Sequence, residues 1–251
     1  MLKKKALFPL CALLLFCSGL TVATELKLAT SPWPPYVDEN LPGKGLAIKL
    51  VTTALTRAGY TTTLKIESWT RTLEGAGIGV YDIIPTAWYS EERARAFSFS
   101  KPYLTNNIML LKRKNDPFTY SDLSSLQGRI IGVIPGYAYG PEFDAAGNFY
   151  RVNSRHLIEN LTRLQQGQID LTLDDERVLL HDLDKYMHNS QDQLIMLPKP
   201  LSVNGLHIAV SRQRPDHEKI VAAFDKAMEE MKEDGEYEKI LNEFSVHRKT
   251  L

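Results

Sequence analysis

YDIIPTAWYSEERARAFSFSKPY, residues 81–103, is the most informative part of this sequence. Its first six residues are apolar enough for a short strand, and Ser90 then offers the N-cap of a short helix. Two glutamates follow in the first turn, where the helix dipole favours acidic side chains. Arg93 comes three residues after Ser90, close to the end of the strand. Amides, a hydroxyl and a guanidinium at a strand tip can together hold a small anion.

The first 23 residues are predicted to be an export signal. Three lysines at positions 3–5 precede an apolar run, residues 6–16, that is too short to cross a bilayer. Small residues before position 24 predict cleavage after Ala23. Cys17 raises the alternative of a lipid anchor, but the bulky phenylalanine before it does not fit a lipidation signal. We therefore expect an exported protein without a lipid anchor.

Composition and charge exclude several other classes of protein. Hydrophobic residues make up 43% and charged residues 24%, which is typical of a soluble globular protein. Cleavage removes three of the 30 basic residues and none of the 30 acidic residues, which leaves a net charge of −3. This charge gives no reason to expect nucleic acid or an anionic membrane as a partner. Both cysteines, Cys11 and Cys17, lie in the signal, so we expect neither a disulfide nor a thiolate metal site.

The residues before position 81 alternate between strand and helix patterns. Strands are expected at 25–30 and 61–67, and helices at 46–59 and from 69 onward. Together with the strand at 81 this order is β-α-β-α-β, which predicts a right-handed, largely parallel sheet. Glycines at 75, 77 and 79 follow a helix and precede a strand, the reverse of the order in a dinucleotide site, so we interpret them as a helix-ending turn.

A second α/β series follows a predicted boundary at residues 114–117. One more strand is expected before this boundary, at 108–112. After it we expect strands at 129–134, 169–173 and 206–210, and helices at 121–126, 157–164, 176–183, 216–231 and 236–244. Two such series of about 80 to 110 residues each indicate a two-lobed protein.

One loop carries two large aromatic side chains between prolines. SPWPPY, residues 31–36, places Trp33 and Tyr36 in a segment whose backbone the prolines stiffen. Loops of this kind lie on the surface and often carry binding residues. We therefore interpret Trp33 and Tyr36 as residues of a cleft.

Nearly the whole mature chain resembles the bacterial extracellular solute-binding proteins of family 3, the polar amino-acid-binding type. The order and spacing of short motifs carry the resemblance: 34–36, 81–82, 90–93, 99–103, 126–128, 132–136, 167–175 and 234–240. The resemblance implies an α/β, two-lobed Venus-flytrap fold of the type II periplasmic binding proteins, with two hinge crossovers near Lys112 and Val203.

The resemblance also implies domain boundaries and a partner. After the signal at 1–23, lobe 1 would consist of residues 24–110 and 205–251, and lobe 2 of residues 111–204. A ligand would lie in the cleft between the lobes. Closure of the cleft about the hinge would be sensed by a membrane permease.

In such proteins an arginine and an acid hold the two ends of the ligand. The motif from Ser90 to Arg93 implies that Arg93 holds a carboxylate, for which a guanidinium offers two parallel donors. The acid that follows the strand at 169–173 would hold an ammonium group. Spacing favours Asp175 for this role, and Asp174 remains an alternative. Opposite charges on two lobes would favour closure around a zwitterion.

Aromatic residues are expected to complete the site. The resemblance places Trp33 and Tyr36 over the ligand side chain, and Tyr137 at the tip of the turn that adds donors to the carboxylate. Trp88 stands where a small hydroxyl residue is usual in the family. A tighter aromatic cleft would suit a larger, aromatic or cationic ligand.

The expected function is a periplasmic, monomeric solute-binding protein that delivers an amino acid or related polar solute to an ABC importer. It would have no catalytic residues, no cofactor and no metal. The alternative is a periplasmic enzyme on the same fold, similar to cyclohexadienyl dehydratases, in which Asp175 or Glu176 would protonate a leaving hydroxyl. A sensor-kinase input domain is not expected, because no transmembrane segment follows residue 251. A regulator of a membrane partner remains a further alternative.

Overall fold

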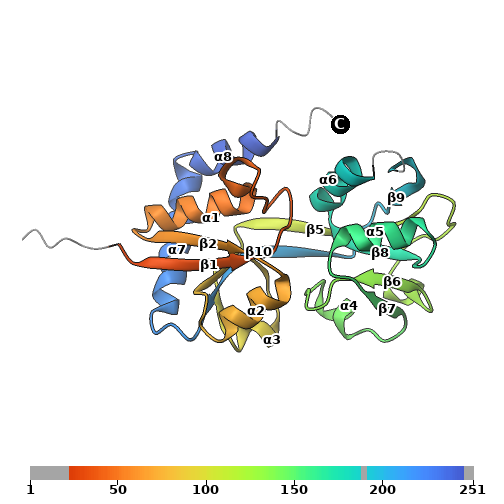
Figure 1. Cartoon of the computed structure of the whole chain (residues 1–251), viewed down its shortest axis with the longest axis horizontal. Helices are drawn as coiled ribbons and strands as arrows, with labels where there is room; N and C mark the ends of the chain where they lie inside the picture. Colours follow the sequence, from red (N-terminus) through yellow and green to blue (C-terminus); the bar gives the residue numbers. More distant parts are fainter. Residues whose placement is uncertain (1–22, 188–190, 246–251) are drawn as a thin grey trace, which may run out of the picture.

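The computed structural model describes residues 23–187 and 191–245. The predicted signal, with Cys11 and Cys17, lies outside these ranges apart from Ala23. Two groups of helices and strands lie next to each other, and strands β5 (Leu104–Arg113) and β10 (Ser202–Ser211) run from one group into the other (Figure 1). We name the group that contains the first strand lobe 1 and the other group lobe 2.

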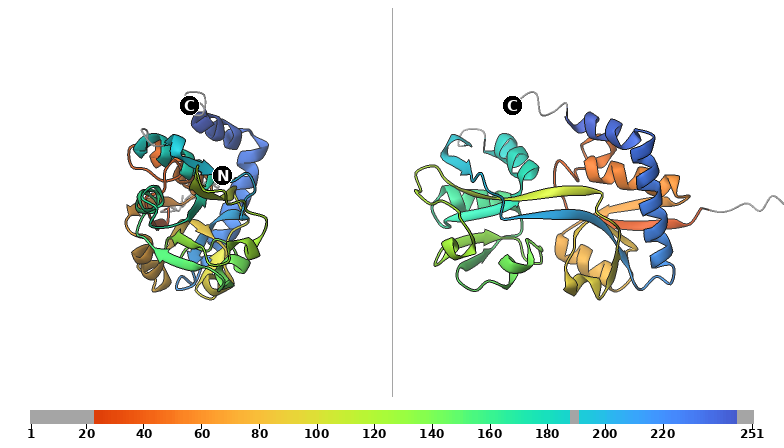
Figure 2. Two further views of the ribbon diagram at one scale, coloured as in Figure 1. Left: turned by 90° about the vertical axis from the view of Figure 1, so that its right-hand side faces the viewer. Right: turned by 180° about the vertical axis from the view of Figure 1, so that it is seen from behind.

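Lobe 1 is an α/β unit whose sheet is covered on both faces. Its elements are β1 (Glu25–Thr30), the 3₁₀ turn η1 (Pro42–Lys44), α1 (Leu46–Arg57), β2 (Thr61–Ile66), α2 (Trp69–Gly77), β3 (Ile83–Trp88), α3 (Glu91–Ala94), β4 (Phe97–Phe99), α7 (His217–Glu233) and α8 (Glu236–Ser245). Helices α1 and α8 lie on one side of the sheet and α2 and α3 on the other (Figure 1). The two C-terminal helices thus return to lobe 1, and Figure 2 shows α7 on the side away from lobe 2.

Lobe 2 repeats the α/β arrangement with shorter elements. They are η2 (Leu123–Leu126), β6 (Ile130–Val133), α4 (Pro141–Ala145), β7 (Tyr150–Asn153), α5 (Leu157–Gln165), β8 (Leu171–Asp175), α6 (Glu176–Tyr186), η3 (Gln191–Gln193) and β9 (Leu194–Met196). Strand β6 is parallel to both β7 and β8. Strand β8 is buried along its whole length and leads directly into α6.

One sheet continues through both lobes in the order β2-β1-β3-β10-β5-β8-β6-β7, with β4 paired to β10 and β9 to β5. Strand β1 is parallel to β2 and β3, as the β-α-β-α-β pattern predicted. Strands β5 and β10 are antiparallel to each other and to their outer neighbours. The parallel prediction therefore holds within each lobe, and the chain passes between the lobes in the antiparallel pair. The exact lobe boundaries remain a prediction.

Local sequence signals account for most of the element ends. Helix α1 buries one apolar face against the sheet, and Gly59 follows it with a φ of 87° that suits the end of a helix. Helix α2 ends at Gly77, and Gly79 has a φ of 80°, which confirms the helix-ending turn. Strands β4, β7 and β9 were not predicted, because three or four residues are too few to show an alternating pattern.

The described residues contain no helix that is both long and apolar enough to cross a membrane.

Candidate functional site

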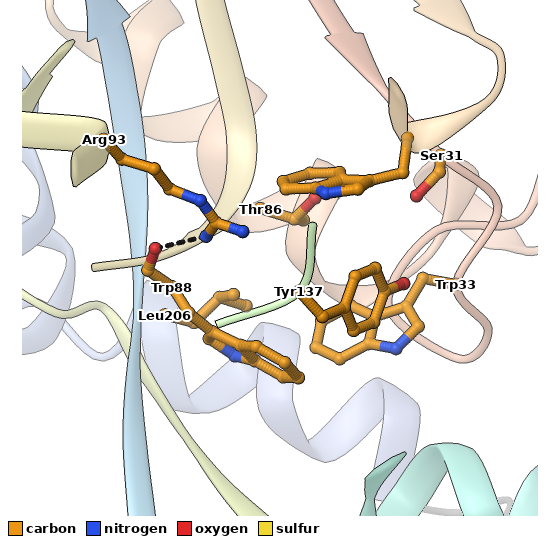
Figure 3. Close-up of a pocket in the computed structure, with 8 residues that line it drawn as sticks. Ser31, Trp33, Thr86, Trp88, Arg93, Tyr137 and Leu206 are labelled. Carbon is orange, nitrogen blue, oxygen red and sulfur yellow. Dashed lines mark hydrogen bonds between the residues drawn. The ribbon is translucent and has the colours of Figure 1, made fainter. Parts of the chain in front are cut away.

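A narrow pocket lies between the lobes at the ends of β3 and α3. Its volume is about 20 Å³, which is room for about one water molecule. Eight residues line it. Seven of them belong to lobe 1 or to β10, and one belongs to lobe 2: Ser31, Trp33, Trp69, Thr86, Trp88, Arg93, Leu206 and, from lobe 2, Tyr137 (Figure 3). We name this space the inner pocket.

Arg93 is the charged group of the inner pocket. The Ser90 hydroxyl caps α3 by accepting from the Arg93 backbone N–H at 3.2 Å, which fixes where the arginine leaves the helix. The guanidinium donates to the Trp88 carbonyl at 2.5 Å and, across the cleft, to the Gly136 carbonyl at 2.5 Å. It also lies 5.0 Å from the centre of the Trp69 ring.

The environment of Arg93 is that of an anion site. The side chain is 8% exposed, and burial lowers its pKa to about 10, so it remains cationic at neutral pH. Its two hydrogen-bond partners are backbone carbonyls, and within the described ranges it forms no ion pair with a carboxylate. A buried cation without an anion is costly. A carboxylate entering the pocket would relieve that cost through paired N–H donors.

Aromatic rings make the pocket narrow. Trp88 meets both Trp33 and Tyr137 edge to face, with centroids 5.6 and 5.4 Å apart, and Tyr137 meets Trp69 at 5.7 Å. Trp33 in turn stacks on Tyr36 at 4.5 Å. Because Tyr137 belongs to lobe 2 and the other rings to lobe 1, ring packing closes the inner pocket when the lobes are together (Figure 3).

Both carboxylate oxygens of Asp175 accept hydrogen bonds from other residues of the protein. As the N-cap of α6, its Oδ1 accepts from the backbone N–H groups of Arg177 at 2.9 Å and Val178 at 3.4 Å. The same oxygen accepts from the Tyr36 hydroxyl at 3.0 Å, and Oδ2 accepts from the Asn106 amide at 3.0 Å. Burial raises its pKa, while these four donors favour the ionised form.

Asp174, the preceding residue, has a different environment. Its Oδ1 accepts from the Trp33 indole N–H at 3.1 Å and from the Asp175 backbone N–H at 2.7 Å. Its Oδ2 is buried and has no hydrogen-bond partner in the part of the chain that the structure describes. The residue is 0% exposed, and burial raises its pKa to about 8, helped by the negative charges of Asp175 and Asp182.

A larger groove opens beside the inner pocket. Its volume is about 920 Å³, at the upper end for small-molecule sites. It shares with the inner pocket Ser31, Trp33, Trp69 and Tyr137. Four carboxylates line it, together with one arginine and one histidine: Glu67, Glu159, Asp174, Asp182, Arg155 and His156. We name this space the outer groove.

The structure places the seven predicted site residues in two groups. Four line the inner pocket: Trp33, Trp88, Arg93 and Tyr137. The other three, Ser90, Tyr36 and Asp175, lie behind it and hold pocket residues or the two lobes in place. Sequence reasoning did not select Ser31, Trp69, Thr86 or Asn106. Their side chains reach the site from a loop, helix α2 and two strands, and no motif marks them. Among the described residues, no group of three or more histidines, cysteines or acids could hold a metal ion.

A two-lobed α/β fold with a charged pocket in its cleft defines a solute-binding protein of the type II periplasmic class. Residues 26–247 match the family described as bacterial extracellular solute-binding proteins, family 3, and the chain belongs to this family. It is therefore an extracellular solute-binding protein.

Known proteins resemble the chain in sequence and in fold. The L-cystine-binding protein TcyJ of Escherichia coli (strain K12) is 27% identical over 209 residues, which cover 81% of this chain and 75% of that protein. A mutant of ArgBP from T. maritima has a TM-score of 0.73 at 20% identity, covering 87% of this chain and 94% of its own.

Two further solved structures share the fold. An ancestral arginine-binding protein bound to arginine has a TM-score of 0.74 at 23% identity, covering 87% of this chain and 97% of its own. A histidine kinase sensor domain with similarity to periplasmic binding proteins has a TM-score of 0.73 at 20% identity, covering 88% and 95%. At these identities the likeness shows the fold alone.

Proposed function

We propose that the chain binds an amino acid with its carboxylate on Arg93 and its remaining groups among the cleft aromatics. The observation that carries this proposal is the buried Arg93 guanidinium, which faces the inner pocket with only carbonyl partners. Tyr137 and Trp33 would cover the ligand, and Trp88 would limit the size of the group beside the carboxylate. The positive end of the ligand would meet the acidic pair Asp174 and Asp175.

The named relatives direct the choice of ligands to test. One is called an L-cystine-binding protein, and one solved relative, AbpA from Streptococcus pneumoniae, is described as bound to L-arginine. Both amino acids carry a second polar or charged end. The outer groove, which adjoins the inner pocket, has the volume to accept such an end. L-Cystine, L-arginine and L-lysine therefore lead the panel.

A thermal-shift screen of the mature protein against the common amino acids and L-cystine tests the proposal. A ligand at about 100 times its dissociation constant adds about 2.7 kcal/mol to the free energy of unfolding. We expect at least one amino acid to raise the melting temperature and Arg93→Ala to abolish that shift. An unshifted melting temperature across the panel, or full binding by Arg93→Ala, would contradict the proposal.

We also propose periplasmic location, cleavage after Ala23, a monomeric protein and an inner-membrane permease as partner. The family's extracellular role supports the location. Intact-mass measurement of the protein released from the periplasm tests the cleavage, because the mature chain would begin at Thr24. Light scattering of the same sample tests the monomer.

Finally, we propose that the site performs no chemistry. The family and its named relatives are substrate-binding proteins, which supports this proposal. One observation keeps the enzyme alternative worth testing: Asp174 is a buried acid whose pKa is raised to about 8, so it carries a proton at neutral pH. Incubation with prephenate and with arogenate should yield no product, and turnover of either compound would establish the alternative.

A further inference from the structure

We infer that Asn106 and Asn204 are positioning residues that hold the two aromatic walls of the inner pocket, Trp88 and Tyr137, from the strands that join the lobes. Asn106 lies on β5 and Asn204 on β10, and neither side chain lines the inner pocket or the outer groove. The inference rests on the proposed function, because it concerns the pocket that would receive the ligand carboxylate.

Asn106 determines how the Trp88 ring lies. It is 0% exposed, and its Oδ1 accepts from the Trp88 indole N–H at 2.9 Å. Its Nδ2 donates to the Tyr36 hydroxyl at 2.9 Å and to Oδ2 of Asp175 at 3.0 Å. An indole nitrogen can only donate, so this set of bonds fixes both the amide orientation of Asn106 and the rotation of the Trp88 ring. Since the bond uses the only polar group of the Trp88 side chain, the ring acts on a ligand through its size and its carbon surface.

Asn204 holds the wall that comes from lobe 2. Its Nδ2 donates to the Ala138 carbonyl at 3.1 Å and to the Tyr139 carbonyl at 3.3 Å. These two residues follow Tyr137 directly in the sequence. The Ser202 hydroxyl, on the same strand as Asn204, also donates to the Tyr139 carbonyl. The turn that carries Tyr137 is therefore hydrogen-bonded to β10 immediately beside the pocket.

The two asparagines lie directly opposite each other in the sheet. Asn204 is the register partner of Asn106 in the antiparallel pair of β5 and β10. Side chains of directly opposed residues project to the same face of a sheet. The rings that they position, Trp88 and Tyr137, meet edge to face with centroids 5.4 Å apart. One cross-strand pair between the lobes thus sets the distance between the wall from lobe 1 and the wall from lobe 2.

This arrangement determines the size of group that the pocket accepts. The inner pocket has a volume of about 20 Å³, so a small shift of either ring decides whether one further methyl group fits beside the carboxylate. Without the Asn106 amide, the Trp88 indole loses its buried partner and the ring is free to rotate. We therefore expect the two asparagines to control selectivity between ligands of different size in addition to stability.

Asn106→Ala and Asn204→Ala test the inference, with Asn107→Ala as the matched control. Asn107 is the next residue of β5, is exposed, and donates at 3.4 Å to Glu176, which lines neither space. The probes are the amino acid of the panel that binds wild type most tightly and its α-methyl derivative, which carries one more methyl group beside the carboxylate. Titration calorimetry gives both dissociation constants, after circular dichroism has shown that each variant folds.

We expect the added methyl group to weaken binding to wild type at least about tenfold, because a tightly packed pocket does not accommodate it. This ratio of dissociation constants should fall below threefold in Asn106→Ala and in Asn204→Ala, and stay within twofold of wild type in Asn107→Ala. A uniform loss for both probes in either pocket variant, or an equal change of the ratio in Asn107→Ala, would overturn the inference and leave the proposed function intact. A ratio below threefold in wild type would overturn it as well.

The indole N–H resonances give a second test that needs no ligand. In ¹⁵N-labelled wild type, the Trp88 indole proton should exchange with solvent more slowly than that of Trp69, whose bond to the Gly136 carbonyl is exposed. Asn106→Ala should shift the Trp88 resonance and speed its exchange, and Asn107→Ala should do neither. An unshifted Trp88 resonance in Asn106→Ala would overturn the inference. So would exchange at Trp88 as fast as at Trp69 in wild type, which can be measured even if Asn106→Ala does not fold.

The two measurements separate the two proposals. If no amino acid binds wild type, the proposed function fails, and the indole resonances alone decide whether Asn106 positions Trp88.

Discussion

The indole nitrogen of Trp33 lies 3.1 Å from Oδ1 of Asp174, so the proline-rich loop of lobe 1 is hydrogen-bonded directly to the end of strand β8 in lobe 2. Tyr36 makes a parallel contact to Asp175, and Arg93 and Trp69 both donate to the Gly136 carbonyl. The protein's own donors therefore already connect the two lobes at both sides of the cleft. A ligand adds to these contacts or exchanges with them.

Arg93→Lys keeps the positive charge of the side chain but removes the two parallel N–H donors of the guanidinium group. We expect at least about a tenfold weaker affinity for any carboxylate ligand, because an ammonium group cannot bond both oxygens in one plane. Titration calorimetry measures the change. Arg95→Lys is the matched control, since Arg95 is an exposed residue at the end of the same short helix and should leave affinity unchanged.

Trp33→Phe removes the one side-chain donor to Asp174 found among residues 23–187 and 191–245, while keeping an aromatic ring. We expect a lower free energy of unfolding, by about 1–3 kcal/mol, because a buried acceptor loses its partner. The ligand-free protein should also become more open, with a larger radius of gyration in small-angle scattering. Tyr150→Phe, at a residue that is 69% exposed, is the control and should change neither quantity. An unchanged stability in Trp33→Phe would show that the bond to Asp174 does not hold the lobes together.

Stability should depend on pH through Asp174. Burial raises its pKa from the ordinary value near 4 to about 8, so the folded chain binds a proton that the unfolded chain releases. Its contribution to the free energy of unfolding therefore falls as pH rises from about 4 to about 8, and is constant above that. Asp174→Asn removes this dependence. Urea unfolding at pH 5 and pH 8 measures the free energy of unfolding of both proteins. The value for the variant relative to wild type should be higher at pH 8 than at pH 5, and an equal difference at both pH values would contradict the raised pKa of Asp174.

Ligand binding should release protons near neutral pH. A cation at Asp174 favours its ionised form, so a carboxyl group that is largely protonated at pH 7 would lose its proton on binding. Calorimetry in two buffers of different ionisation enthalpy measures the number released. We expect a value between zero and one in wild type and none in Asp174→Asn. Equal release in both proteins would assign the proton to another group.

Gly136→Ala tests the turn whose Gly136 carbonyl accepts a hydrogen bond from Arg93. Gly136 has a φ of 76°, and an added Cβ would lie 3.3 Å from the Trp69 indole nitrogen. Gly128 is the matched control, because it has a φ of 71° and open space around its Cβ position. Both substitutions should cost about 1–2 kcal/mol of stability through backbone strain. Gly136→Ala alone should also weaken ligand binding, and equal affinity in the two variants would remove this turn from the site.

The sequence was sufficient for the parts of the site that are local. Arg93 and its cap Ser90 belong to one short helix, so their relationship could be read from spacing alone. Helices α1 and α7 of lobe 1 were predicted because each buries one continuous face. Short strands such as β4 and β9 depend on their partners in the sheet and carry no signal of their own.

The choice between two adjacent acids could not be made from the sequence. Neighbouring side chains of a strand point to opposite faces of the sheet. An error of one residue in the predicted strand register therefore exchanges the predicted orientations of the two acids. Asn106 on β5 binds the side chains of Tyr36, Trp88 and Asp175, which come from three other segments. Such a contact exists only after the lobes and their connecting strands have come together.

The pairing of β5 with β10 has a consequence for how the lobes can move. Residues 104–108 are hydrogen-bonded in register to residues 202–206. The connection is thus a two-stranded ladder rather than a pair of independent loops, and it resists bending within the plane of the sheet more than bending out of that plane. Opening of the cleft should therefore be a hinge rotation that bends the ladder out of its plane, with the amide protons of both strands remaining protected from exchange throughout the cycle of opening and closing.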